Sequence, residues 1–102
     1  HYAGLPCDMQ RIHEVCKEKN IYIIEDASHA LGATNNSCEK VGSCTYSDIT
    51  VFSFHPVKSI TIGESGMITT NNEEFYHKLL KLRTHGIQQK EVGFQNFHSW
   101  KE

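Results

Sequence analysis

Two residues that could hold and use one cofactor follow separate apolar runs of this sequence. Asp26 follows the run 21–25, and Lys58 lies just past the run 49–54. A lysine amine can form a Schiff base with a pyridoxal ring, and a carboxylate can keep the ring nitrogen protonated. Because open α/β sheets bind ligands beyond the carboxyl ends of their strands, the two side chains can meet at one sheet edge.

Two further residues near this pair could contact the same ligand. His29 could donate to a phenolic oxygen or stack near the ring, and the Ser53 hydroxyl could donate to a phosphate. Taken singly, His29 and Ser53 fit plain structural roles better. Asp26 fits a helix cap equally well, and most lysines in the position of Lys58 are solvated surface residues. The pair of acid and lysine therefore favours cofactor chemistry more than any single residue does.

A metal-binding module is the alternative from another class. His13 and Cys16 form an H-x-x-C pair with Cys7 nearby, but no CxxC motif is present. Cys16 fits the apolar stripe of a helix better than a ligand set. The cysteine pattern instead indicates a reduced, cytoplasmic setting and no metal.

Hydrophobic periodicity predicts an α/β order of elements. We expect helices over 8–19 and 73–84, begun by Asp8 and Asn72, and strands over 21–25, 49–54 and 67–70. The first two strands should be neighbours in a mostly parallel sheet, covered on both faces, with both helices packed on it. The polar stretch 34–44 predicts a turn or small hairpin.

Length and composition limit the functions that this chain can have. It has 102 residues, 38% of them hydrophobic, and a formal net charge of −2. This charge gives no reason to expect nucleic acid or a membrane as partner, and no apolar run is long enough to span a bilayer. The low hydrophobic fraction predicts that core partners lie outside the chain, including a surface for the aromatic residues of 88–102.

Several motifs together resemble one known family. They are Glu25-Asp26-Ala27-Ser28-His29-Ala30-Leu31-Gly32-Ala33, Val41-Gly42-Ser43, Ser53-Phe54-His55-Pro56-Val57-Lys58, Gly63-Glu64-Ser65-Gly66 and Leu82-Arg83-Thr84-His85-Gly86. In this order and spacing they are similar to the DegT/DnrJ/EryC1/StrS family of pyridoxal-phosphate-dependent aminotransferases of nucleotide-linked keto-sugars. Within that family the sequence of these motifs is most similar to the transaminases of pseudaminic acid synthesis.

The resemblance implies a role for each matching residue. Lys58 matches the lysine that binds pyridoxal 5'-phosphate covalently, and Asp26 matches the acid that pairs with the pyridine nitrogen. His29 takes the place of a residue that lies against the cofactor, and Ser53 matches a serine that binds its phosphate. The family reaction is ping-pong, with glutamate as the expected donor and a UDP-linked keto-sugar as acceptor. Lys58 also argues against the dehydratase branch of the family, which has histidine there.

The resemblance also implies what surrounds this chain. Residues 1–102 are expected to be the central part of the large domain of a fold-type-I aminotransferase, with the flanking segments and the small C-terminal domain absent. The whole protein is expected to be a homodimer, and the isolated chain to be inactive. Ile62 and Ser65 replace family residues, Ser65 at a glycine whose backbone angle serine disfavours, and the loop 35–40 lacks a customary glycine. These departures leave a truncated, non-catalytic remnant as the second hypothesis.

Overall fold

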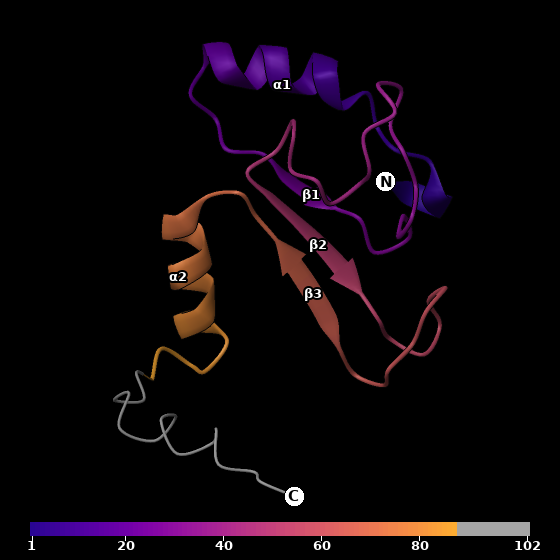
Figure 1. Ribbon diagram of the computed structural model, residues 1–102, viewed down its shortest axis with the longest axis vertical. Coiled ribbons are helices and arrows are strands. Elements are labelled where there is room, and N and C mark those ends of the chain that lie inside the picture. Colours follow the sequence, from indigo (N-terminus) through magenta and orange to yellow (C-terminus); the bar gives the residue numbers. More distant parts are fainter. Residues whose placement is uncertain (88–102) are drawn as a thin grey trace, which may run out of the picture.

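The computed structural model describes residues 1–87, so the expectation for the aromatic residues of 88–102 lies outside the described part. A short 3₁₀ turn, Tyr2–Gly4, precedes helix α1, Met9–Glu18. Strands β1, Ile24–Asp26, β2, Ile49–Ser53, and β3, Gly66–Thr69, follow, and helix α2 spans Glu73–Leu82 (Figure 1). Every predicted element therefore exists, and the α/β order is confirmed.

Both helices begin at the predicted caps. The Asp8 side chain accepts a hydrogen bond from the Arg11 N–H at 3.2 Å, and the Asn72 side chain accepts one from the Phe75 N–H at 3.0 Å. Each bond satisfies a backbone donor that has no partner inside the first turn of its helix. The polar residue before each apolar stripe thus sets where the helix starts.

The three strands form one mixed sheet in the order β1-β2-β3. β1 and β2 pair in parallel, with Ile24 opposite Ile49 and Asp26 opposite Val51, which confirms the predicted neighbours. β3 pairs antiparallel to β2, with Ser53 opposite Gly66. Because β1 and β2 run parallel, the chain leaves both strands, after Asp26 and after Ser53, at the same end of the sheet.

The first strand is shorter than predicted. Residues 21–23 are not strand, and the Ile23 N–H donates to the Asp48 carboxylate at 2.7 Å instead of joining a ladder. The ladder register begins with Ile24 opposite Ile49, and Ile23 contributes only its carbonyl, which accepts from the Asp48 and Ile49 N–H groups at 3.0 and 3.3 Å. The expectation of a strand buried on both faces is also wrong, because Ile24 is 65% exposed while Glu25 is buried.

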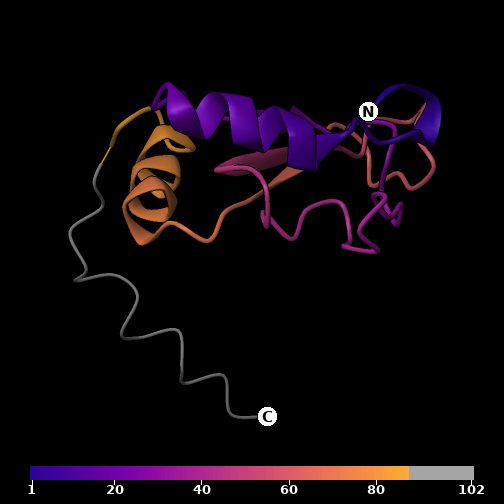
Figure 2. The same ribbon diagram turned by 90° about the horizontal axis from the view of Figure 1, so that it is seen from above.

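The helices do not bury the apolar faces that their periodicity predicts. Met9 is the one buried residue of α1, and α2 has none. α2 instead meets the segment before β1, where Phe75 and Tyr22 pack edge to face at 5.3 Å between ring centroids. In Figure 2, α2 lies to one side of the strands. An apolar groove lined by residues of β2, β3 and α2 lies between this helix and the sheet. The prediction that both helices pack closely on the sheet is therefore wrong for the described residues.

The apolar core lies under the turn that follows β1. Ala27, Ala30 and Phe52 form its fully buried part, at most 3% exposed. Gly42, in the predicted turn 34–44, lies against the Phe52 ring with φ at +95°. Within the described residues, no helix combines the length and apolar character needed to cross a membrane.

We expect Gly42→Ala to destabilise the fold through steric overlap as well as backbone strain. A Cβ at this position would lie 2.7 Å from the Phe52 ring, in a core that cannot move aside freely. Gly32→Ala is a matched control, because Gly32 has φ at +83° and no atom lies within 4 Å of the place where its Cβ would stand. Thermal unfolding should show the control losing about 1 kcal/mol and Gly42→Ala about 1–3 kcal/mol more. Equal losses would contradict the packing argument.

Candidate active site

An open hollow lies where the chain leaves β1. Its volume is about 270 Å³, and it is open to solvent. The residues that line it are His1, Tyr2, Asp26, Ser28, His29 and Lys58. Three of the four residues singled out from the sequence, Asp26, His29 and Lys58, thus share one hollow.

Asp26 enters this hollow as the last residue of β1. The Ala27 N–H donates to the Val51 carbonyl at 2.8 Å, and this bond is the last of the ladder. The Ser28 N–H then donates to Asp26 Oδ1 at 3.0 Å. Hydrogen bonding from Ser28, its side chain first and then its backbone, lowers the pKa of the Asp26 carboxyl. These hydrogen bonds outweigh the small desolvation of this exposed carboxyl, which acts in the opposite direction.

Lys58 reaches the hollow from a tight turn after β2. Its N–H donates to the His55 carbonyl at 2.9 Å, and the Val57 N–H donates to His55 Nδ1 at 3.3 Å. His55 therefore holds the turn that carries Lys58, and does not line the hollow itself. Across residues 1–87, the Lys58 amine makes no hydrogen bond or ion pair that would compete with a ligand.

The other two predicted residues differ in placement. His29 lies on the wall of the hollow beside Tyr2, with ring centroids 5.6 Å apart. Ser53 does not line the hollow; its hydroxyl oxygen accepts from the His55 N–H at 3.4 Å at the end of β2. That bond uses an acceptor position, so the Ser53 proton is still available to a ligand beyond the strand end.

Sequence reasoning missed the residues that the first segment brings to the hollow. His1 and Tyr2 line it although they lie 24 positions or more before Asp26, and no strand-end or periodicity signal marks them. Ser28 was also missed. An Asp-x-Ser pattern after a strand predicts an Asx-type turn, which is the signal that could have identified it.

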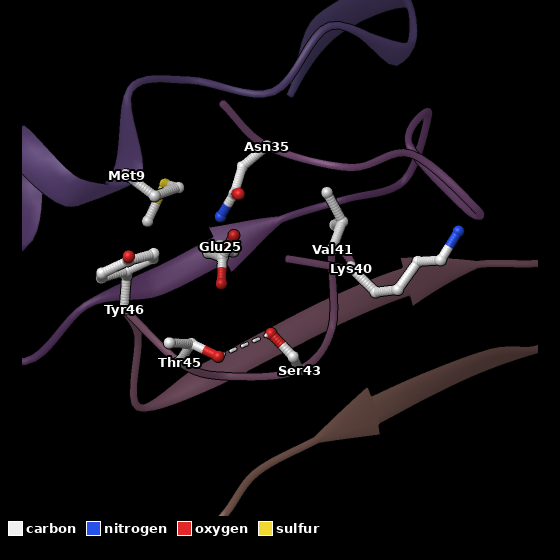
Figure 3. A pocket seen from close by; sticks show the side chains of 8 residues that line it. All are labelled: Met9, Glu25, Asn35, Lys40, Val41, Ser43, Thr45 and Tyr46. Atoms are coloured by element: carbon white, nitrogen blue, oxygen red, sulfur yellow. Dashed lines mark hydrogen bonds between the residues drawn. The ribbon is translucent and has the colours of Figure 1, made fainter. Parts of the chain in front are cut away.

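A buried carboxylate beside the hollow was missed as well. Glu25 is only 8% exposed and lies among Met9, Asn35 and Tyr46 in a second, smaller cavity (Figure 3). It accepts hydrogen bonds from Thr50 at 3.0 Å and from Ser47. Glutamate is rarely buried unless it is paired, so an acid inside a run of apolar residues was the available signal.

The departures from the family pattern have different structural consequences. Ser65 is not among the described non-glycine residues with positive φ, and its carbonyl accepts from the Phe54 N–H at 2.9 Å. The expectation that serine is strained there is therefore wrong. In the loop 35–40, Cys38 has φ at +62°, so a cysteine occupies the left-handed conformation that favours glycine.

The metal-ligand alternative finds no support in the described part of the chain. His13 Nδ1 lies 3.1 Å from the Tyr46 carbonyl, which requires an N–H at that nitrogen. No group of three or more His, Cys, Asp or Glu side chains in residues 1–87 is arranged to hold a metal ion.

Curated relatives of this sequence include sugar transaminases. It is 51% identical over 87 residues to an uncharacterised protein of Methanocaldococcus jannaschii, covering 85% of this chain and 22% of the relative. It is 47% identical over 91 residues to a UDP-4-amino-4,6-dideoxy-N-acetyl-beta-L-altrosamine transaminase of Campylobacter jejuni, covering 89% and 23%. A GDP-perosamine synthase of Vibrio cholerae is 39% identical over 87 residues, covering 85% and 23%. The chain thus spans about a quarter of the length of these relatives.

Solved structures share the fold at similar coverage. Helicobacter pylori PseC, an aminotransferase involved in the biosynthesis of pseudoaminic acid, superposes with a TM-score of 0.79 at 35% identity, over 90% of this chain and 24% of that one. Ntda from Bacillus subtilis, with bound cofactor PMP, gives a TM-score of 0.75 at 34% identity, over 94% and 20%. The described residues therefore share the α/β fold of part of the fold-type-I aminotransferases, as predicted.

The shared fold is that of aminotransferases, and the sequence shows to which family of aminotransferases the chain belongs. The family model for the DegT/DnrJ/EryC1/StrS aminotransferase family matches residues 1–99. The chain belongs to this family, as the resemblance of its motifs predicted. The family depends on pyridoxal phosphate, which confirms the predicted cofactor class.

We expect the Asp26 carboxyl to titrate with a pKa below its usual value of 3.8 in the folded protein. Because its folded pKa is lowered, its contribution to stability is present above the unfolded value and is lost as pH falls through the folded one. Ser28→Ala should raise the Asp26 pKa, since it removes the largest cause of the shift, while Ser37→Ala should not. Carboxyl-carbon NMR titration measures both, and an unchanged Asp26 titration in Ser28→Ala would refute this origin.

Proposed function

We propose that this chain is the cofactor-binding segment of a sugar aminotransferase. The reaction would pass an amino group from glutamate to the 4-keto group of a nucleotide-linked 6-deoxy sugar. The observation that carries the proposal is the hollow that both Asp26 and Lys58 line, where the Lys58 amine has no partner among residues 1–87. An acid and a lysine placed together beyond strand ends suit a pyridoxal cofactor better than any other chemistry in the described residues.

The residues fit that cofactor in charge and in donor type. The Ser28 hydrogen bonds lower the pKa of Asp26, which favours the carboxylate form that can pair with a protonated pyridine nitrogen. Lys58 is half-buried, and its amine has no competing acceptor among residues 1–87. His29 lies on the wall where it can contact the ring, and Ser53 keeps a hydroxyl proton for the phosphate at the end of β2.

Each residue would then do a defined part of the work. When bound, pyridoxal phosphate supplies an electron sink for the carbon that exchanges its amino group. Asp26 would hold the proton on the pyridine nitrogen. Lys58 would bind the cofactor at rest and, once displaced by substrate, would move the proton at the reacting carbon as general base and acid. Glutamate would leave as 2-oxoglutarate in the first half, and the sugar ketone would take the amino group in the second.

The proposed acceptor is a UDP-linked 4-keto-6-deoxy-N-acetyl sugar. The support is the 47% identity to the altrosamine transaminase of Campylobacter jejuni, above the 39% to the GDP-perosamine synthase. A GDP-linked keto-sugar is the competing acceptor. Comparing kcat/KM for the UDP- and GDP-linked substrates in the active protein distinguishes the two, and a preference for GDP would overturn the UDP assignment.

The setting of this segment is part of the same proposal. We place residues 1–102 in the central part of a large domain within a longer, cytoplasmic, homodimeric enzyme, and we expect the isolated chain to be inactive. A constellation of this kind needs supporting residues that hold it within about 0.5 Å. A non-catalytic remnant remains the second candidate, favoured by Ile62 and Ser65, although Ser65 is accommodated without positive φ.

Lys58 should be the residue that carries the cofactor. Borohydride reduction of the protein loaded with pyridoxal phosphate, followed by peptide mapping, should place the label on Lys58. Lys58→Ala should abolish both label and transamination, whereas Lys78→Ala, on the exposed face of α2, should change neither. A label on any other lysine would overturn the assignment.

Asp26→Asn should keep the cofactor bound but slow the reaction. The amide has nearly the same size as the carboxylate yet cannot stabilise a charged pyridine nitrogen. We expect kcat to fall about 10²- to 10³-fold, with the dissociation constant of the cofactor changing much less. Asp8→Asn, at the cap of α1, is the control for a loss of carboxylate charge outside the hollow. A wild-type rate in Asp26→Asn would remove Asp26 from the mechanism.

A further inference from the structure

Glu25 is the centre of a buried hydrogen-bond network beneath the candidate site. Its Oε1 accepts from Thr50 Oγ1 at 3.0 Å and from Ser47 Oγ, and its Oε2 lies 2.6 Å from His1 Nε2. Thr50 is fully buried, and the side chains of His1 and Glu25 are 2% and 7% exposed. The network joins the first segment, β1, the loop before β2 and β2 itself.

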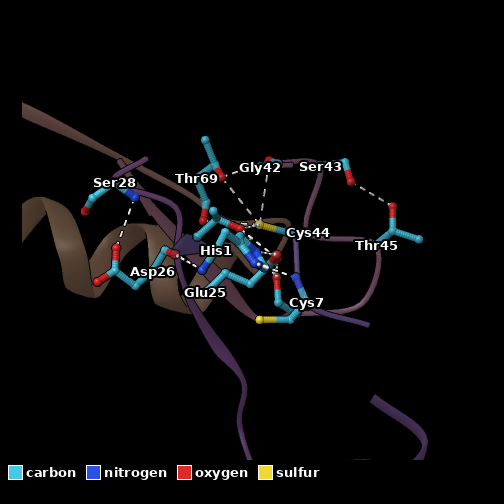
Figure 4. A network of polar contacts seen from close by, with 12 residues as sticks. His1, Cys7, Glu25, Asp26, Ser28, Gly42, Ser43, Cys44, Thr45 and Thr69 are labelled. Carbon is cyan, nitrogen blue, oxygen red and sulfur yellow. Dashed lines mark hydrogen bonds and ion pairs between the residues drawn. The ribbon is translucent and has the colours of Figure 1, made fainter. Parts of the chain in front are cut away.

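The backbone determines which nitrogen of His1 carries the proton. The Cys7 N–H donates to His1 Nδ1 at 3.1 Å, so this nitrogen has no hydrogen (Figure 4). Nε2 must then carry the hydrogen and donate it to Glu25. All three contacts of the Glu25 carboxylate are therefore donors, which is the arrangement that stabilises a buried anion.

The same strand presents Glu25 and Asp26 to opposite sides. Successive side chains of a strand alternate, and the pattern in β1 is exposed, buried, exposed. Figure 4 shows Asp26 with Ser28 on one side and His1 with Cys7 on the other. In addition, the backbone nitrogen of His1 donates to the Asp26 carbonyl at 3.0 Å. Any rotation of β1 that frees Glu25 must therefore also move Asp26.

We infer that Glu25 is a positioning residue that fixes the direction of Asp26 and holds His1 and Tyr2 against the hollow. This inference deepens the proposed function and rests on it for the role of Asp26 toward a pyridoxal ring. β1 is only three residues long, so its backbone ladder alone gives little resistance to twisting. A buried anion that needs all its donors supplies that resistance, because losing any one leaves it incompletely paired.

Three variants test this role in the protein that carries this segment. Thr50→Val keeps the shape of Thr50 but removes its donor, Thr50→Ser keeps the donor, and Glu25→Gln keeps the size of Glu25 but adds hydrogens where donors point. The first readout is the carboxyl-carbon NMR titration of Asp26 in the cofactor-free protein. The second is the dissociation constant of pyridoxal phosphate, with the pH titration of its absorbance. Circular dichroism shows that each variant is folded.

We expect Thr50→Val and Glu25→Gln to raise the pKa of Asp26 toward that of an ordinary aspartate. Both should weaken cofactor binding about tenfold, because each leaves a buried polar group without its partner. Thr50→Ser should behave like wild type. The direction of the change in the Asp26 pKa separates two causes. Removing the negative charge of Glu25 without any movement of Asp26 would lower the Asp26 pKa instead of raising it. If Glu25→Gln does not fold, the comparison of Thr50→Val with Thr50→Ser still tests the positioning role, since neither variant changes a charge.

Failure of this inference differs from failure of the proposed function. A wild-type protein that binds no pyridoxal phosphate would overturn the function, while the Asp26 titration would still test the positioning. If Thr50→Val is folded and its Asp26 pKa equals that of the wild type, the positioning role is refuted, whatever the dissociation constant of pyridoxal phosphate is. A lowered Asp26 pKa in Glu25→Gln would likewise show that Glu25 acts on Asp26 only through its charge, and would refute the inference.

Discussion

Parallel pairing of β1 with β2 is the constraint on which the rest of the candidate site depends. The register of Asp26 opposite Val51 makes both strands end at one edge, so the chain delivers Asp26 and the Lys58 turn to the same side. The Ala27 N–H bond to the Val51 carbonyl closes the ladder at that point. A shift of one residue would turn Asp26 inward and Glu25 outward, because side chains alternate along a strand. An unpaired acid would then lie in the core.

Polar contacts therefore carry much of the specificity in this part of the protein. The fully buried apolar cluster around Ala27, Ala30 and Phe52 is small, whereas Glu25 and Thr50 are buried polar residues at the centre of the sheet. The burial of so small an apolar cluster does little to distinguish one register from another. A buried carboxylate with three donors does, because each alternative leaves charged or polar groups unpaired.

The chain tolerates its departures from the family pattern by different local means. Ser65 needs no unusual backbone angle, and it contributes its carbonyl to the turn that follows β2. Cys38 instead takes the left-handed conformation, supported by Asn35, whose side chain accepts from the Ser37 and Glu39 N–H groups at 3.0 Å. Neither Cys38 nor Ser65 lines the hollow.

The amino-acid sequence by itself determined the order of elements, the helix starts at Asp8 and Asn72, and the pairing of Asp26 with Lys58 as candidates. These depend on local propensity, capping and the rule that strand ends meet at one edge, all of which are written in short stretches of chain. The tertiary structure decided the rest. It showed that the ladder of β1 begins at Ile24, that α2 stands away from the sheet, and that His1 and Tyr2 reach the hollow. These features arise from contacts between distant segments, whose free energies no local pattern encodes.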